Sequence, residues 1–306
     1  MIAPLLDRFR AGDRLALARL LSLAARGECL PKIAAALAAP ARPARVVALT
    51  GPGGVGKSTL AGKLIEHVRA TGLKVAVLAC DPQSPLSGGA LLGDRFRMPS
   101  RPDDEGVYIR SLAAVSGRGA VAEHLGLMVQ LLEAFGFDVV LIETVGAGQG
   151  DTAVRELADV VVLLLQPETG DDLQWEKAGV LEVADVVAIH KADLPGAEQA
   201  LAQVRAALDL SGTRNVPVLR VSARTGEGID ALWQAILASP GRRQAGGAGA
   251  DELLRLAQQA LAARYARARA GGDERLGRLL QAWRQGGLSA QEAAAAVLEL
   301  LSGGPR

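Results

Sequence analysis

The sequence has little of several features that would place it in a specialised class. Aromatic residues make up only 3% of the chain. Cysteines number two among 306 residues, which excludes a disulfide framework and a cysteine-rich zinc site. The net charge is +1, so the chain lacks the positive field of a dedicated nucleic-acid-binding protein. The longest strongly apolar run, Val160–Leu165, is far shorter than the roughly 20 residues that cross a bilayer. We therefore expect no nucleic-acid partner and no membrane anchor.

The remaining composition is that of a globular protein. Hydrophobic residues make up 49% of the chain and charged residues 22%, and the length allows about two domains of ~150 residues, or one nucleotide-binding domain with helical additions. Near the start, Asp7 and Asp13 interrupt the stretch where a secretory signal would need an unbroken apolar core. Together with the scarcity of cysteine, this predicts a cytoplasmic protein.

Short apolar or β-branched runs alternate with helix-like stretches through the middle of the chain. The predicted strands are 46–49, 75–79, 139–142, 160–165, 186–189 and 218–221. Alternation of strand and helix is typical of a parallel sheet whose two faces are covered by helices. The predicted fold class is therefore α/β, with a doubly wound, mostly parallel sheet.

Helical patterns flank this central region on both sides. Residues 13–26 predict an amphipathic helix capped by Asp13, and beyond Pro240 a glycine-rich connector leads into further helices, one of them opened by a capping box of Ser289 and Glu292. The predicted organisation is a helical extension at 1–40, a nucleotide-binding domain at 41–240 and a helical extension at 241–306. Three short helices make a poor core on their own, so we expect the last segment to pack on the central domain or on a second copy of the chain.

A glycine-rich segment between the first predicted strand and a helix fits the phosphate-loop pattern G-x-x-x-x-G-K-[ST]. Glycines admit the dihedrals that let backbone N–H groups wrap a phosphate, and the helix N-terminus adds partial positive charge. Lys57 is expected to bridge the β- and γ-phosphates and Ser58 to ligate Mg²⁺. The predicted phosphate contacts are Gly51, Gly53, Gly54, Val55, Gly56, Lys57, Ser58 and Thr59.

Two carboxylates follow predicted strands and are candidates for the Mg²⁺ site. Asp81 comes after the run 75–80 and Glu143 after the run 139–142, so both are expected at the carboxyl edge of the sheet, beside the phosphate loop. Mg²⁺ prefers oxygen ligands and usually takes one or two protein carboxylates. The run from Glu143 to Gly146 resembles a Walker B strand that ends in a glycine whose N–H can sense a γ-phosphate.

Two later segments are candidates for binding the base of a nucleotide. His190, Lys191 and Asp193 resemble the Asn-Lys-x-Asp motif, in which the aspartate accepts from guanine N1–H and the 2-amino group. Ser222 and Ala223 resemble the Ser-Ala loop whose N–H meets guanine O6. These cues favour guanine over adenine, although an imidazole at position 190 in place of an amide predicts weaker guanine binding.

Several further strings, in this order along the chain, resemble those of the MeaB/ArgK family of P-loop GTPases. They are 81–85 (DPQSP), 87–94 (SGGALLGD), 143–149 (ETVGAGQ) and 170–174 (GDDLQ), which leads to Lys177. The resemblance covers roughly residues 40–235. Departures from the usual family pattern include Gln83, the pair Gln149-Gly150 and His190.

The resemblance implies further site residues. Asp81, Asp94 and Glu143 would join Ser58 around Mg²⁺ in one or another nucleotide state, and residues near 168–179 would form a further switch that carries Gln174 and Lys177. The residues expected to act in hydrolysis are Lys57, Glu143, Gly146 and Lys177.

The resemblance also implies a function: a GTP-hydrolysing, Mg²⁺-dependent chaperone of an adenosylcobalamin-dependent acyl-CoA mutase, of methylmalonyl-CoA, isobutyryl-CoA or hydroxyisobutyryl-CoA type. The ligands implied by this resemblance are GTP/GDP and Mg²⁺. Proteins of this family are usually homodimers through C-terminal helices, so the resemblance also implies a second copy of the chain as a partner. A small-molecule kinase of the arginine/ornithine transport type, or an ATPase, is the alternative enzyme. A nucleotide-sensing binding module is the alternative without catalysis.

Overall fold

The computed structural model describes two compact units, Met1–Gln244 and Ala245–Arg306. The structure describes residues 2–37, 42–82, 104–114, 124–144, 150–167, 181, 184–210, 215–241, 243, 257–258, 261–262 and 264–302. Because the chain divides in this way, the arrangement of each unit is given separately.

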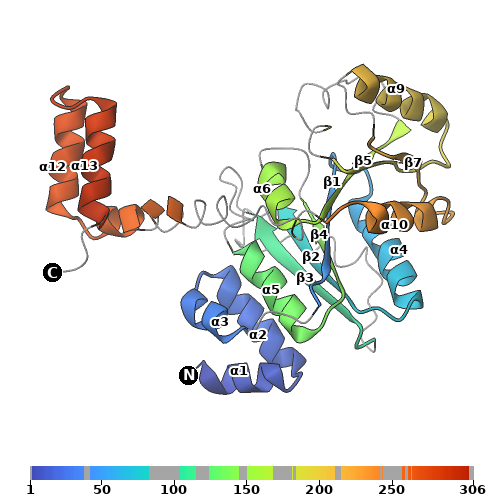
Figure 1. Ribbon diagram of the computed structural model, residues 1–306, viewed down its shortest axis with the longest axis horizontal. Helices are drawn as coiled ribbons and strands as arrows, with labels where there is room; N and C mark the ends of the chain where they lie inside the picture. Colours follow the sequence, from blue (N-terminus) through green and yellow to red (C-terminus); the bar gives the residue numbers. More distant parts are fainter. Residues whose placement is uncertain are drawn as a thin grey trace. The chain divides into compact units, whose positions relative to one another are not determined.

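The first unit is built on a seven-stranded sheet in which all paired strands are parallel, in the order β3-β2-β4-β1-β5-β6-β7 (Figure 1). The central strands are apolar and buried on both faces, as parallel strands between two helical layers require. The predicted doubly wound α/β class is confirmed. The strands are β1 Arg45–Thr50, β2 Val75–Pro82, β3 Val107–Ala114, β4 Val139–Glu143, β5 Val160–Leu165, β6 Val186–Ile189 and β7 Val218–Arg220.

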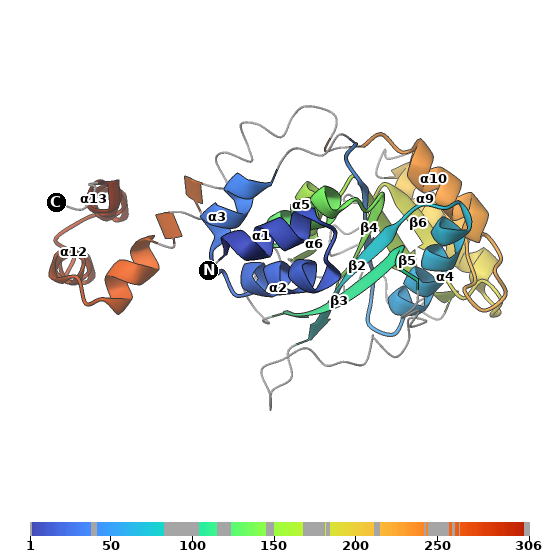
Figure 2. The ribbon, with the colours of Figure 1, turned by 90° about the horizontal axis from the view of Figure 1, so that it is seen from below.

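Helices cover both faces of this sheet (Figures 1 and 2). One face packs against α4 and α10, and the other against α2, α5 and α9, because alternate residues of each strand join separate apolar clusters. No helix in the described part of the chain is long and apolar enough to cross a membrane. The helices of this unit are α1 Ala3–Arg10, α2 Arg14–Ala25, α3 Leu30–Ala36, α4 Lys57–Ala70, α5 Leu125–Phe135, α6 Gly150–Leu157, α9 Ala197–Leu210 and α10 Ile229–Ala238.

The N-terminal helices belong to the core of the first unit. Asp13 caps α2 by accepting hydrogen bonds from the N–H groups of Leu15 and Ala16, as its position predicts. The apolar stripe of α2, which includes Leu17 and Leu20, is fully buried in the cluster that also contains α5 and one face of the sheet. Removing this helix would therefore expose the same core that supports β1 and β4.

Strand β3 at the edge of the sheet was not among the strands expected from the sequence. Arg110 and Ser111 interrupt its apolar pattern, which weakens the sequence signal. The structure explains the arginine, because its guanidinium donates to the carbonyl oxygen of Ala18 (3.2 Å) and to the hydroxyl oxygen of Ser22 (3.0 Å) on α2. A charged residue at this edge thus joins the sheet to the N-terminal helices.

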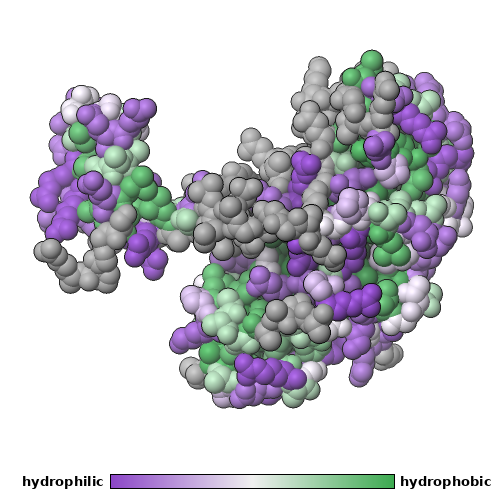
Figure 3. Space-filling view, viewed as in Figure 1, coloured by the Kyte–Doolittle hydropathy of each residue, from purple (hydrophilic) through white to green (hydrophobic). Residues whose placement is uncertain are grey.

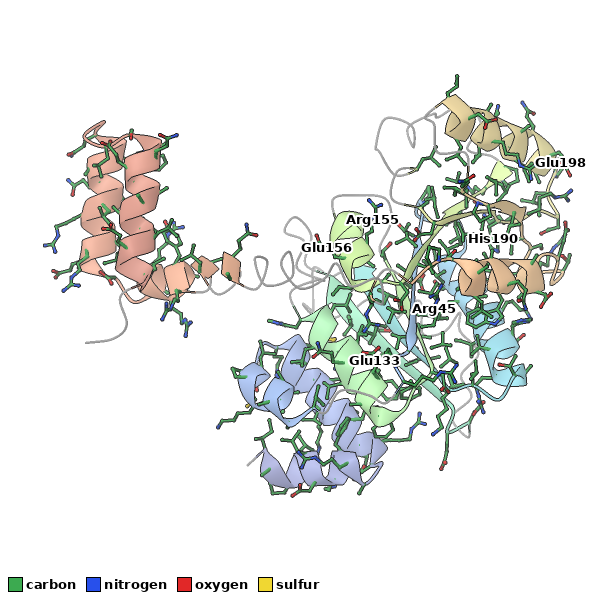
Figure 4. The ribbon with its side chains drawn as sticks, viewed as in Figure 1. Arg45, Glu133, Arg155, Glu156, His190 and Glu198 are labelled. Atoms are coloured by element: carbon green, nitrogen blue, oxygen red, sulfur yellow. The ribbon has the colours of Figure 1, made fainter. Side chains whose placement is uncertain are left out.

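A cluster of buried carboxylates binds Arg243, the last described residue of the first unit, at the amino end of the sheet. Arg243 donates to both carboxylate oxygens of Glu133 on α5, at 2.9 and 3.0 Å (Figure 4 labels Glu133). Glu133 also accepts from the N–H of Ala44, and Asp159 accepts from the N–H groups of Val46 and Arg243. Both carboxylates are buried, and each is compensated by a cation and by backbone donors.

The second unit contains a helical hairpin of α12 (Glu274–Arg284) and α13 (Ala290–Ser302). Asp273 caps α12, and Ser289 and Glu292 form the predicted capping box at the start of α13. The surface of the hairpin contains both hydrophilic and hydrophobic residues (Figure 3). The side chains of Trp283 and Leu298 are each nearly half exposed, at 48% and 46%. The hairpin therefore leaves large apolar side chains unburied within this unit.

Two leucines two residues apart on α2 test whether the N-terminal helices support the nucleotide-binding unit. Leu17 is 0% exposed and Leu15 is 68% exposed. Truncation of a buried leucine costs about 2–5 kcal/mol, so Leu17→Ala is expected to lower the free energy of unfolding by that amount. The matched variant Leu15→Ala should change it by less than about 0.5 kcal/mol. Urea denaturation followed by circular dichroism measures both, and equal effects would show that α2 is not part of this core.

Candidate functional site

The phosphate loop joins β1 to α4 at the carboxyl edge of the sheet. Gly51, Gly54 and Gly56 have φ values of +142°, +76° and +99°, a region that side-chain-bearing residues rarely adopt. A Cβ at Gly51 would overlap the carbonyl group of Leu164 on β5, so the loop leaves the sheet in close contact with the next strand. Gly53 and Gly54 are exposed and Val55 is buried, which anchors a loop whose tip is open to solvent.

Lys57 and Ser58 open α4, with Gly56 at the N-cap position. The Lys57 ammonium donates to the carbonyl oxygens of Gly51 (2.9 Å) and Pro52 (3.1 Å), so it spans the loop on which a triphosphate would lie. Thr59 is exposed in the first turn of the helix. The N-terminus of α4 contributes a partial positive charge to this loop and the Lys57 ammonium contributes a full one. Both favour binding of an anion.

Ser58 and Glu143 meet beside the loop. The Ser58 hydroxyl donates to Oε1 of Glu143 at 2.7 Å, and both residues are buried. Glu143 is the last residue of β4 and pairs in register with Leu49 of β1, which brings the end of that strand next to the phosphate loop. A hydroxyl and a carboxylate oxygen are ligands that suit Mg²⁺, so this pair fits the predicted metal position.

The backbone places Asp81 at the same edge of the sheet. Ala79 of β2 pairs with Glu143 of β4, so Asp81 lies two residues further toward the carboxyl end, where it pairs with Ala113 of β3. Its side chain lies outside the described residues. Asp94, Gly146, Gln174 and Lys177, which were also predicted at the site, lie outside them as well.

His190 follows β6 and lies against the phosphate loop (Figure 4 labels it). It is 3% exposed, its Nδ1 lies 2.7 Å from the carbonyl oxygen of Val55, and its Nε2 lies 3.3 Å from the backbone nitrogen of Ala223. A carbonyl oxygen requires a donor and an amide N–H requires an acceptor, so these partners assign the neutral ring with its proton on Nδ1. Burial lowers the pKa of the His190 imidazole below its ordinary value, while the hydrogen bond to Val55 opposes that shift.

Lys191 makes a second connection from β6 to the phosphate loop. Its ammonium donates to the carbonyl oxygen of Gly54 at 3.1 Å and to Oε1 of Gln166 at 2.7 Å, and its own backbone has a φ of +56°. Gln166 directly follows β5. The two segments that the sequence associated with base and phosphate are therefore in direct contact.

The structure also brings together Asp193 and Ser222, two of the residues predicted to bind a base. The Ser222 hydroxyl donates to Oδ1 of Asp193, and the guanidinium of Arg224 lies 2.6 Å from Oδ2. The hydrogen bond from Ser222, helped by Arg224, holds the pKa of the Asp193 carboxyl below its usual range. The carboxylate is thus ionised at neutral pH and able to accept hydrogen bonds from a base.

Sequence reasoning missed two residues of this site. Arg224 forms an ion pair with Oδ2 of Asp193, and Gln166 accepts a hydrogen bond from the ammonium of Lys191. Each could have been found by position, because Arg224 directly follows the Ser-Ala pair and Gln166 follows a predicted strand at the sheet edge that carries the other site residues.

The fold and this loop define a P-loop nucleotide-binding protein. Residues 18–268 match the family model of the methylmalonyl Co-A mutase-associated GTPase MeaB. The chain therefore belongs to the MeaB family of P-loop GTPases, which confirms the resemblance found in its motifs, and it is a GTPase.

Individual relatives agree with this assignment. A Pyrococcus horikoshii protein provisionally named a GTPase is 40% identical over 242 residues, 77% of this chain and 76% of that protein. The mouse (Mus musculus) mitochondrial methylmalonic aciduria type A homolog is 41% identical over 197 residues, 62% of this chain and 48% of that protein. A fused isobutyryl-CoA mutase of Cupriavidus metallidurans is 36% identical over 251 residues, 78% of this chain and 23% of that protein.

A solved structure matches almost the whole chain. The crystal structure of a LAO/AO transport system kinase aligns with a TM-score of 0.67 at 26% identity and covers 99% of this chain and 98% of its own.

The buried imidazole predicts a pH dependence of folding stability. The unfolded chain binds a proton on His190 near pH 6.5, whereas the folded chain, with its lowered pKa, does not. Stability should therefore fall as the pH drops below about 6.5 toward the folded-state pKa. His190→Asn removes this contribution, so its urea-unfolding free energy should fall less steeply over this range. Curves of equal slope for the two proteins would contradict the assignment of a neutral buried ring.

The ion pair of Arg224 predicts competition with a bound base. A guanine that donates to Oδ2 of Asp193 would compete with this guanidinium for the same oxygen atom. Because Arg224 is 75% exposed, the pair is weak, and Arg224→Gln is expected to tighten GTP binding by about 1.5- to 5-fold in calorimetry. Arg205→Gln, an exposed arginine on α9, changes the net charge equally and should leave affinity unchanged. Weaker binding by the Arg224 variant would show that this arginine contacts the nucleotide instead.

Proposed function

We propose that this MeaB-family GTPase is a cytoplasmic chaperone of an adenosylcobalamin-dependent acyl-CoA mutase. It would gate loading of the cofactor and protect or reactivate the mutase. The observation that carries the proposal is the family match over residues 18–268, whose description names methylmalonyl Co-A mutase. Further support comes from a relative that carries a similar sequence within a fused isobutyryl-CoA mutase.

The proposed substrate site uses the contacts described above. The proposed phosphate contacts are Gly51, Gly53, Gly54, Val55, Gly56, Lys57, Ser58 and Thr59, and the base would be bound by the two segments that carry His190, Lys191, Asp193, Ser222 and Ala223. The ammonium of Lys57 would neutralise charge that develops on the transferring phosphoryl group, and the backbone N–H groups of the loop would hold the phosphates in line. Asp193 would orient the base through its ionised carboxylate.

Mg²⁺ would be held by Ser58 and Glu143, with Asp81 and Asp94 as further proposed ligands. The buried pair of hydroxyl and carboxylate oxygens at 2.7 Å is the observation that fits such an ion. When bound, Mg²⁺ supplies charge neutralisation between the β- and γ-phosphates. Gly146 and Lys177 are proposed to respond to the γ-phosphate.

Hydrolysis would be coupled to the mutase through the segments near the γ-phosphate. Loss of that phosphate removes contacts that hold such segments, so one cleavage changes the surface offered to a partner. The second unit is proposed to join two copies of the chain, because Trp283 and Leu298 leave apolar surface exposed on its hairpin. Analytical ultracentrifugation of the full chain tests this dimer.

The proposed activity is tested with purified protein, GTP and Mg²⁺. Phosphate release without an added acceptor is expected to be slow, and faster when an adenosylcobalamin-dependent acyl-CoA mutase is present. Methylmalonyl-CoA and isobutyryl-CoA mutases are compared side by side, and the client is the one that stimulates the rate. If neither stimulates it and neither copurifies with the protein from its native cell, the chaperone role is wrong.

Lys57→Ala distinguishes catalysis at this loop from a contaminating activity. The variant loses the cation that spans the loop, so nucleotide binding and phosphate release should both be abolished. Phosphate appearing on arginine or ornithine in the wild-type reaction would instead support the kinase named for the solved relative. GTP binding without turnover, with or without a mutase, would favour a nucleotide-sensing module.

A further inference from the structure

Both ring nitrogens of His190 are committed to the protein itself. Nδ1 donates to the carbonyl oxygen of Val55 in the phosphate loop (2.7 Å), and Nε2 accepts from the N–H of Ala223 in the Ser-Ala loop (3.3 Å). A neutral imidazole has one donor and one acceptor, so no hydrogen-bonding atom of the ring remains. The ring therefore connects the phosphate-binding and base-binding segments and has nothing left to offer a ligand.

The ring is also confined in place. It is 3% exposed, and a Cβ built on Gly56 would lie 2.6 Å from its Cε1 and 2.7 Å from its Nδ1. The imidazole thus packs directly on the backbone of the phosphate loop, in space that is open only because residue 56 is a glycine. Turning the ring toward a base would break a buried hydrogen bond and leave the Val55 carbonyl unsatisfied.

The position of the ring indicates which part of a guanine it would face. In the proposed site Asp193 would take the N1–H and 2-amino edge, and the Ser-Ala loop would face O6. Guanine N7 is the acceptor next to O6 on the opposite edge. His190 contacts the Ala223 amide of that loop, so in this site the ring would lie on the O6 and N7 side of the base.

We propose that His190 is a positioning residue that ties the phosphate loop to the Ser-Ala loop, and that it consequently offers no hydrogen bond to the N7 of a bound guanine. Base selection then depends on the N1–H and 2-amino edge through Asp193. This inference rests on the proposed guanine site and goes beyond it by stating which edge of the base determines specificity.

An amide at position 190 would behave differently. Asparagine carries two N–H donors and an acceptor oxygen, so one N–H can satisfy Val55, the oxygen can accept from Ala223, and the second N–H remains for N7. The imidazole reproduces the two contacts within the protein but lacks that additional donor. The substitution His190→Asn should therefore create a contact that the natural chain does not make.

The test compares GTP with 7-deaza-GTP, which carries a C–H in place of N7. In calorimetry with the full chain and Mg²⁺, the natural protein is expected to bind the two nucleotides within about 2-fold of each other. His190→Asn should prefer GTP by roughly 5-fold, the value of one hydrogen bond. His67→Asn, a substitution of the histidine on α4, should retain the 2-fold ratio of the natural protein.

The outcomes separate this inference from the proposed function. Discrimination of 5-fold or more by the natural protein, or no gain in His190→Asn, would overturn the inference, whereas failure to bind either nucleotide would overturn the proposed guanine site. If the variant does not fold, ¹⁵N NMR of the histidine rings serves instead. The ring of His190 should show a protonated Nδ1 and an unprotonated Nε2 both without and with GTP, and a change of tautomer on binding would refute its role.

Discussion

The parallel pairing of β1 between β4 and β5 is the constraint on which the site depends. It brings the ends of three strands to one edge, so that the phosphate loop, Glu143 and Gln166 start from neighbouring positions. Gly51 leaves β1 so close to Leu164 that no side chain fits between them. The geometry of the site is therefore set by the backbone of the sheet before any functional side chain is placed.

Side chains then hold the phosphate loop from two directions. Lys57, from the helix that follows the loop, donates to the carbonyls of Gly51 and Pro52. His190 and Lys191, from the end of β6, donate to the carbonyls of Val55 and Gly54. Carbonyl groups that are satisfied within the protein do not face an incoming phosphate, which leaves the loop suited to an anion.

Much of this arrangement could be predicted from local patterns. The phosphate loop, the cap at Asp13 and the capping box at Ser289 depend on residues close in sequence, and the structure shows the two caps where they were expected. Strand β3 was missed because Arg110 interrupts its apolar pattern, and the reason for that arginine lies on α2, far away in the sequence. The partners of His190 could not be predicted either, since they belong to loops 135 residues before it and 33 residues after it.

The chemical state of His190 limits how a water molecule can be activated for attack on a phosphate. Its lone pair and its proton are both used within the protein, so the ring has no capacity to relay a proton. Of the chain's other histidines, His67 lies beside Asp230 and His124 lies beside Gly27. In the proposed hydrolysis at this loop, His190 would therefore supply no acid–base catalysis, and a carboxylate oxygen or an oxygen atom of the nucleotide would have to accept the proton of the attacking water in place of this ring.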